Sequence, residues 1–195
     1  MGGEITNLES SPRLLVFAGP NGSGKSTVAK GIKIIGTYIN ADDIKAQSRC
    51  SDIDAAREAE RLREFCLESG ADFTFETVLS TNRNLELLRR AKLAGYTIEC
   101  IFVLTASVEI NILRVKSRVS EGGHDVPIEK IRSRYEKSLV NLPELLSICE
   151  TCTIFDNSFD TPVVIYRKDK KREVISEVPL WPKKRITNLV CGQNL

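Results

Sequence analysis

Short apolar runs alternate along the chain with longer segments whose apolar residues recur three and four positions apart. The apolar runs predict five strands, near residues 14–18, 37–40, 73–75, 97–104 and 153–155. The segments between them predict helices near residues 25–34, 52–69, 85–93, 107–119 and 128–142, with one more starting near Ile44. Asp52 is expected to be the N-cap of the helix over residues 52–69. Strands that alternate with helices are typical of an α/β domain with a mostly parallel sheet.

The end of the chain has a different pattern. Residues 162–166 and 173–178 predict two further strands on either side of the basic run 167–172. A charged hairpin turn explains this basic run better than an interaction patch does. We therefore expect a C-terminal β-hairpin after the α/β core.

Length and composition favour a single domain. A chain of 195 residues with 42% hydrophobic content can bury one sizeable core. We expect one domain over residues 1–195, with a core at about 12–160 and the hairpin and tail at about 161–195. Residues before Ser11 and after Arg185 are expected to be loosely held.

A glycine-rich loop follows the first apolar run directly. It reads Gly19-Pro20-Asn21-Gly22-Ser23-Gly24-Lys25-Ser26-Thr27. This spacing between a strand and a helix is that of a phosphate-binding loop, in which backbone N–H groups and the helix N-terminus face the phosphates. Lys25 is expected to reach the β- and γ-phosphates, and Ser26 to coordinate magnesium. The sequence therefore predicts ATP and Mg²⁺ as cofactors, bound by residues 19–27.

Two carboxylates follow predicted strands at the edge of the sheet where this loop lies. Asp42 can accept a proton from an attacking hydroxyl or hold magnesium through water, while its neighbour Asp43 is expected to cap the next helix. Glu76 directly follows buried aromatic residues, where a carboxylate is costly unless a cation or substrate hydroxyls pair with it. A buried structural ion pair is the alternative for Glu76.

Four arginines lie on either side of a glycine pair at residues 122–123. Arg114 and Arg118 are four residues apart on one predicted helix, and Arg132 and Arg134 lie on the next. Phosphoryl transfer needs cations that neutralise the moving phosphoryl group, and a glycine hinge suits a lid that closes over the nucleotide. We expect Arg118 and Arg134 to be the lid arginines.

Net charge and cysteine content limit the classes of partner and the location that we expect for the protein. The formal net charge of +2 argues against nucleic acid or a membrane surface as the main partner. Six cysteines without a second metal-ligand pair favour free thiols and a cytoplasmic location, with Cys149 and Cys152 in a structural rather than a redox role. The single histidine, His124, is expected to fix a loop by hydrogen bonding.

Several strings of the sequence together resemble the zeta toxin family of P-loop kinases, and in particular its short members known as predicted ATPases. The resemblance covers about residues 12–160, and its most specific part is Gly-Gly-His-Asp-Val-Pro followed by Arg-Tyr. The strings occupy residues 17–27, 38–44, 75–80, 122–127 and 134–139.

This resemblance implies a P-loop NTPase fold and a function. Asp42 corresponds to the base that activates a sugar hydroxyl, and Glu76 with Thr77 to residues that hold the acceptor. Arg118 and Arg134 correspond best to the lid arginines. The family reaction is the ATP-dependent phosphorylation of UDP-N-acetylglucosamine, and family members are usually paired with a protein antitoxin.

Two other functions stay open. In the first, the protein is a kinase whose acceptor is another small metabolite or a nucleoside. In the second, the protein is a nucleotide-dependent switch that hydrolyses ATP slowly and acts through a partner. Asp42 and the lid arginines argue against the switch, because a protein that only binds nucleotide needs neither.

Overall fold

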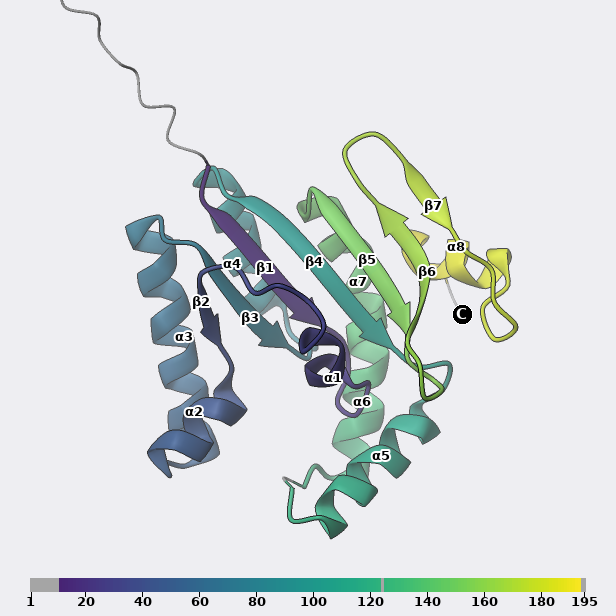
Figure 1. The fold of residues 1–195 in the computed structure, drawn as a ribbon, viewed down its shortest axis with the longest axis horizontal. Helices are drawn as coiled ribbons and strands as arrows, with labels where there is room; N and C mark the ends of the chain where they lie inside the picture. The colour runs from purple at the N-terminus through teal and green to yellow at the C-terminus, as the bar shows by residue number, and fades with distance from the viewer. Residues whose placement is uncertain (1–10, 124, 194–195) are drawn as a thin grey trace, which may run out of the picture.

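A single seven-stranded sheet runs through the molecule, in the order β2-β3-β1-β4-β5-β6-β7 (Figure 1). The structure is a computed structural model that describes residues 11–123 and 125–193. The strands are β1 (Arg13–Ala18), β2 (Thr37–Ile39), β3 (Phe73–Thr77), β4 (Thr97–Leu104), β5 (Thr151–Asp156), β6 (Val163–Lys168) and β7 (Glu173–Ile175). The helices are α1 (Lys25–Ala29), α2 (Ala41–Ser48), α3 (Asp52–Ser69), α4 (Asn82–Leu93), α5 (Val108–Ser120), α6 (Ile128–Val140), α7 (Leu142–Ile148) and α8 (Lys183–Cys191).

The five parallel strands and the C-terminal hairpin confirm the predicted architecture. β1 to β5 pair in parallel, and β6 and β7 pair antiparallel. The hairpin extends the same sheet, so the sheet has seven strands where five were predicted. β1 is central and lies between β3 and β4, which makes it apolar on both faces.

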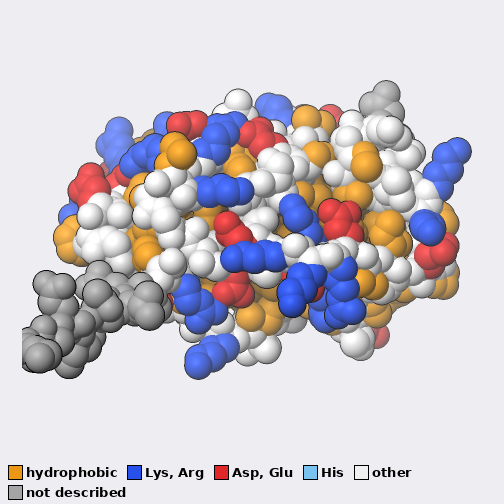
Figure 2. Space-filling view, turned by 90° about the horizontal axis from the view of Figure 1, so that it is seen from above, with side chains coloured by type: hydrophobic (Ala, Val, Ile, Leu, Met, Phe, Trp, Pro, Cys, Tyr) orange, Lys and Arg blue, Asp and Glu red, His pale blue; other side chains and the backbone are white. Residues whose placement is uncertain are grey.

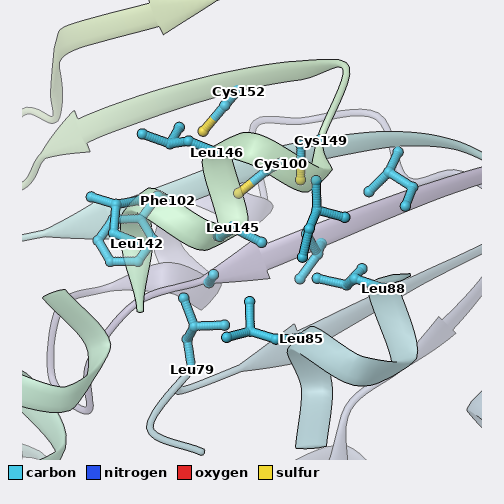
Figure 3. Close-up of a cluster of buried hydrophobic side chains, with 14 of the residues drawn as sticks. Leu79, Leu85, Leu88, Cys100, Phe102, Leu142, Leu145, Leu146, Cys149 and Cys152 are labelled. Carbon is cyan, nitrogen blue, oxygen red and sulfur yellow. The ribbon is translucent and has the colours of Figure 1, made fainter. Parts of the chain in front are cut away.

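The two faces of the sheet are covered unequally. A large core packs the buried sides of α3, α4, α7 and α8 against one face, and Figure 3 shows its central part around Leu85, Leu88, Leu142 and Leu145. A much smaller cluster covers β1 on the other face, beside α1. Most of the packed core that supports the site therefore lies on one face of the sheet.

Four cysteines belong to the large core, and three of them lie together. Cys100, Cys149 and Cys152 are buried free thiols whose side chains lie together (Figure 3). Burial, and then contact with the other two thiols, raises the pKa of Cys100. Free thiols buried in a core act as small apolar side chains, which fits the structural role expected for Cys149 and Cys152.

The helix after the phosphate-binding loop is shorter than predicted. It was expected over residues 25–34, but α1 ends at Ala29. The hydroxyl of buried Thr74 accepts a hydrogen bond from the N–H of Ile35 at 3.0 Å and donates one to its carbonyl at 2.6 Å. This contact with β3 satisfies the backbone of Ile35, so the chain leaves the helix before it.

Two helix caps also differ from the prediction. Asn40, not Asp43, caps α2, because its side-chain oxygen accepts the N–H of Asp42 at 2.9 Å. Ser51, not Asp52, caps α3. In both cases the residue one to three positions earlier has the extended backbone that a cap requires.

The tail after Arg185 is packed, which corrects the prediction that it is loosely held. α8 buries Ile186 and Leu189 in the large core, next to fully buried Trp181. The Arg185 guanidinium lies 4.0 Å from the centre of the Trp181 ring and donates a hydrogen bond to the Ala106 carbonyl at 2.8 Å. The matching prediction for residues 1–10, and that for His124, lie outside the described residues.

The surface carries charged side chains of both signs. On the face shown in Figure 2, basic and acidic side chains are interspersed. None of the helices in the described part of the chain is long and apolar enough to cross a membrane.

Candidate functional site

The phosphate-binding loop leaves the end of β1 with a backbone that only glycine allows. Gly19 and Gly22 have φ angles of 139° and 75°. A Cβ at Gly19 would lie 2.0 Å from the Val103 carbonyl oxygen, and one at Gly22 would lie 2.5 Å from that of Asn111. Neighbouring backbone therefore excludes any larger residue at both positions.

Two asparagines fix the loop from neighbouring elements. The Asn111 side chain on α5 donates to the Asn21 carbonyl at 2.7 Å, and its oxygen accepts from the Thr105 hydroxyl. The Asn157 side chain, just after β5, donates to the Ser23 carbonyl at 2.8 Å. The sequence analysis missed both residues. A signal existed for Asn111, since it lies four residues before Val115 on the apolar stripe of its helix.

The loop has the features of an anion site. The buried Ser23 hydroxyl has no hydrogen-bond partner among the described residues. The first backbone hydrogen bonds of α1 are donated by the N–H groups of Thr27 and Val28. The N–H groups of Lys25 and Ser26 therefore take no part in the hydrogen bonds within the helix. These groups and the glycine-lined curve fit the phosphates of a nucleotide.

Lys25 is held on the loop itself. Its Nζ donates to the carbonyls of Gly19 at 2.8 Å and Pro20 at 3.1 Å. Desolvation lowers the pKa of Lys25 to about 8, while the nearby charges of Glu76 and Asp42 raise it and that of Arg118 lowers it. The amine that was expected to meet phosphates thus lies within electrostatic reach of the other predicted site residues.

Glu76, at the end of β3, is held by two hydroxyl groups. Its Oε2 accepts from the Ser26 hydroxyl at 3.2 Å, and its Oε1 accepts from the Tyr38 hydroxyl. The Asn40 amide in turn donates to the Tyr38 oxygen at 3.4 Å. The parallel register of β2 and β3, with Tyr38 opposite Thr74, brings these side chains together. No sequence signal distinguished Tyr38.

A cavity of about 660 Å³ opens beside this network. Asp42, exposed in the first turn of α2, and Arg134, from α6, both line it. Its remaining lining residues come from α2, α3, α4, the segment before α6 and α6 itself, and they include Arg57, Arg83 and Lys130. The predicted base and one predicted lid arginine therefore border the same space.

The four candidate arginines make different contacts in the structure. Arg134 donates to the Asn21 side chain in the loop at 3.2 Å. Arg118 is exposed near the end of α5, and its charge acts on Lys25. Arg132 instead pairs with Glu109 at 2.8 Å on an exposed surface, and Arg114 donates to the Asn157 carbonyl at 2.6 Å. Arg134 therefore contacts the phosphate-binding loop, and a lid role for Arg118 and Arg134 stays a prediction.

Thr77 stabilises the turn that directly follows β3. It is buried, and its hydroxyl oxygen accepts hydrogen bonds from the Leu79 N–H at 2.9 Å and the Asn84 side chain at 2.7 Å. Leu79 has a left-handed φ of 58°, so these bonds stabilise a strained turn. A contact between Thr77 and an acceptor stays a prediction.

The donor set near the loop fits magnesium. Hydroxyl and carboxylate oxygens are the ligands that Mg²⁺ prefers, and Ser26 and Glu76 supply one of each. Among the described residues no group of three or more His, Cys, Asp or Glu side chains is arranged to hold a metal by itself.

Comparison with protein families matches residues 3–175 to the zeta toxin family. The chain belongs to the zeta toxin family. This confirms the resemblance found in the sequence and extends it at both ends. An uncharacterized protein of Haemophilus influenzae is a relative, 33% identical over 132 residues, which are 63% of this chain and 92% of that protein.

Solved structures share the fold of this zeta toxin family member. The AvrRxo1-ORF1:AvrRxo1-ORF2 complex matches with a TM-score of 0.70 and 15% identity over 96% of this chain when solved with sulphate ions, and with 0.66 and 16% over 86% when solved with ATP. The chain spans 66% and 61% of those chains, about two thirds of their length or less. A chain of the PezAT chromosomal toxin–antitoxin system of Streptococcus pneumoniae matches with a TM-score of 0.59 and 17% identity, over 97% of this chain and 84% of that one.

Proposed function

We propose that this protein is an ATP-dependent kinase that transfers the γ-phosphoryl group to a hydroxyl of a small acceptor, a nucleotide sugar such as UDP-N-acetylglucosamine. The observation that carries the proposal is that Asp42 and Arg134 line one cavity and both reach toward the phosphate-binding loop, since Arg134 donates to the Asn21 side chain and the charge of Asp42 acts on Lys25. Family membership and the fold shared with an ATP-bound complex support the choice of nucleotide.

The loop and Lys25 hold the nucleotide. The backbone N–H groups of Lys25 and Ser26 bind the phosphates, and Lys25 exchanges its two loop carbonyls for phosphate oxygens. Ser26 holds Mg²⁺, which when bound neutralises charge on the β- and γ-phosphates. Arg118 and Arg134 stabilise the negative charge of the phosphoryl group in transit, from the two helices that flank residues 121–127.

Asp42 is the base. Its position in the first turn of α2 directs the carboxylate to the cavity, where the acceptor hydroxyl loses its proton as the phosphoryl group arrives. The cavity lining has four basic side chains beside four acidic ones, and the basic ones can pair with phosphate groups on an acceptor; they are Arg57, Arg83, Lys130 and Arg134, and the acids are Asp42, Asp52, Glu60 and Asp125. Arg83 is held by Glu60 at 2.9 Å, so it is already oriented.

A protein antitoxin is the proposed partner, and the cytoplasm the proposed place of action. One similar structure contains two proteins, AvrRxo1-ORF1 and AvrRxo1-ORF2, and another comes from a named toxin–antitoxin system. ATP and nucleotide sugars are cytoplasmic metabolites, which agrees with this location.

A panel of acceptors tests the activity. The protein is incubated with ATP and Mg²⁺ and with UDP-sugars, nucleosides or polyols, and mass spectrometry then identifies any acceptor that gains a phosphate. A UDP-sugar is the expected product. A phosphorylated nucleoside or polyol would instead support another metabolite kinase. ADP formed at the same rate without any acceptor would contradict the kinase and support the nucleotide switch.

Variants of Asp42 and of its neighbour Asp43 form a matched pair that tests which residue is the base. Asp42→Asn should bind ATP nearly as well as the wild type but lose at least about a hundredfold in transfer rate, the usual contribution of a general base. Asp43→Asn, an exposed neighbour that does not line the cavity, should keep the wild-type rate. Unchanged turnover in Asp42→Asn rules out the assigned base.

A further inference from the structure

The junction between β4 and α5, residues 105–107, is held by side chains from elements that are distant in the sequence. Tyr135 on α6 donates a hydrogen bond to the Thr105 carbonyl at 2.7 Å. Arg185 on α8 donates one to the next carbonyl, that of Ala106, at 2.8 Å. Two consecutive carbonyls therefore connect α6 and α8 to the backbone directly before α5.

Arg185 is itself fixed in orientation. One guanidinium nitrogen donates to the Leu180 carbonyl at 2.7 Å, and another donates to Ala106. The guanidinium also lies 4.0 Å from the centre of the ring of fully buried Trp181. A planar group that is bonded at two nitrogens and stacked on an aromatic ring has little freedom to rotate. Because α8 packs into the large core, Arg185 ties the start of α5 to that core.

The far end of α5 carries Arg118, whose position depends strongly on this junction. At about 1.5 Å of rise per residue, Arg118 lies about 18 Å from Ala106 along the helix, so a tilt of about 5° moves it by about 1.5 Å. Asn111, which holds the phosphate-binding loop, lies closer to the junction, and its side-chain oxygen also accepts from the Thr105 hydroxyl. A small movement of the junction should therefore displace Arg118 much more than Asn111.

We propose that Arg185 is a positioning residue for phosphoryl transfer, which fixes the start of α5 and thereby places Arg118 at the nucleotide. The proposal deepens the proposed function and rests on its assignment of Arg118 to the phosphoryl group in transit. The zeta toxin family model matches residues 3–175, so Trp181 and α8 lie after the matched range. The proposal gives this segment a part in the reaction.

Other bonds keep the junction formed when Arg185 is changed. The Ala106 N–H donates to the Ser158 hydroxyl at 2.8 Å, and the Thr105 hydroxyl donates to the Ser107 carbonyl at 2.9 Å. Ala106 is only partly buried, so water can reach its carbonyl. Loss of the Arg185 bonds should therefore loosen the junction without unfolding it.

Tyr135 connects the second arginine helix to the same junction. It directly follows Arg134 on α6. Burial raises the pKa of Tyr135 to about 12, so its hydroxyl keeps the proton that it donates to Thr105 at neutral pH. The charge of Arg185 acts on this hydroxyl and opposes the rise, which shows that the two donors are near each other. The helices of Arg118 and Arg134 thus share one anchoring point.

Steady-state kinetics of the full chain test the proposal. Arg185→Met keeps an apolar chain on Trp181 but removes both hydrogen bonds. It should lower kcat about tenfold or more, a cost typical of a group misplaced by about 1 Å or less, while both KM values stay within about twofold of the wild type. Arg185→Lys, which can still donate to one carbonyl, should recover part of kcat. Lys184→Met, an exposed neighbour on α8, is the matched control with a wild-type rate.

Amide hydrogen exchange measures the junction without any need for turnover. With adenylyl imidodiphosphate and Mg²⁺ bound, the amides of α5 should exchange about threefold faster or more in Arg185→Met than in the wild type. Val190→Ala separates positioning from stability, because Val190 packs against the large core from α8 and does not touch the junction. It should lower Tm and speed exchange in α8, with wild-type exchange in α5 and a wild-type kcat.

Three results overturn the proposal. They are wild-type exchange of α5 in a folded Arg185→Met, a wild-type kcat in that variant, and an equal fall of kcat in Val190→Ala, which would make the effect one of stability alone. If Arg185→Met does not fold, Tyr135→Phe takes its place, because it removes a single oxygen and should also speed exchange in α5 and lower kcat.

The two readouts also distinguish this proposal from the proposed function. If the wild-type protein phosphorylates no acceptor, the proposed function fails and exchange alone decides. Faster exchange of α5 in Arg185→Met with the analogue bound then still supports Arg185 as the residue that positions this helix, and unchanged exchange overturns it.

Discussion

Lys25 shows at the scale of a single residue how the loop is prepared for an anion. The same desolvation that lowers its pKa to about 8 leaves its ammonium bonded only to backbone carbonyls among the contacts of the described structure. Phosphate oxygens are stronger acceptors because they carry charge. An arriving nucleotide should therefore raise the pKa of Lys25 again.

Nucleotide affinity should fall with rising pH through this lysine. With a pKa of about 8, Lys25 is about nine-tenths protonated at pH 7 and about one-tenth at pH 9, so affinity for the ATP analogue should drop roughly tenfold. Binding near pH 8 must then take up a proton, since the bound form is protonated and the free form only partly so. Calorimetry in buffers of different ionisation enthalpy measures that uptake. Lys25→Met should show none, and equal uptake by this variant would exclude Lys25 as the source.

Sequence patterns predicted the residues that belong to a contiguous motif and missed those that act across the fold. Lys25 and Ser26 follow from the spacing of the loop. Asn157 and Tyr38 reach the site from β5 and β2, and only the strand order brings them to it. Asn111 was detectable in principle, because an amide on an apolar helical stripe needs a buried partner.

At the scale of helices and strands, the local sequence pattern gave wrong predictions where tertiary contacts determine whether a helix forms and where it ends. α1 ends early because Thr74 takes the backbone of Ile35. α8 has three basic residues at its start, which oppose the helix dipole, and it forms because Ile186 and Leu189 pack beside Trp181. Strong periodicity succeeded for α3, whose end at Ser69–Gly70 was predicted.

The turn between α5 and α6 gives an element-scale prediction. A Cβ at Gly123 would lie 2.5 Å from the Arg118 side chain and 2.8 Å from its carbonyl oxygen. Gly123→Ala should displace Arg118 and lower the rate of transfer about tenfold or more, because the arginine must reach the phosphoryl group. Gly31→Ala, where a Cβ meets only an ordinary contact of 3.7 Å, is the matched control. Steady-state kinetics with thermal melting of both variants checks this, and a wild-type rate for Gly123→Ala would remove Arg118 from the lid.

At the scale of the whole molecule, parallel pairing assembles a site from distant segments. Ala18, just before the loop, lies opposite Thr77 on β3 and Phe102 on β4, so the loop, Glu76 and α5 start from one edge of the sheet. Strand alternation predicted that edge. The cavity beside it depends on how α2, α3 and α6 pack, and no local pattern contains that information.

Because the loop joins the central strand to three neighbouring elements, nucleotide binding should stabilise the entire fold. A ligand at about 100 times its Kd adds about 2.7 kcal/mol, which for a chain of this size raises Tm by about 5–10 °C. Asp42→Asn should show the full shift, since Asp42 faces the acceptor cavity, whereas Lys25→Met should lose most of it. Scanning calorimetry with the non-hydrolysable analogue and Mg²⁺ measures both. A small shift in Asp42→Asn together with a full one in Lys25→Met would reverse the roles of the two residues, because it would make the carboxylate the nucleotide anchor.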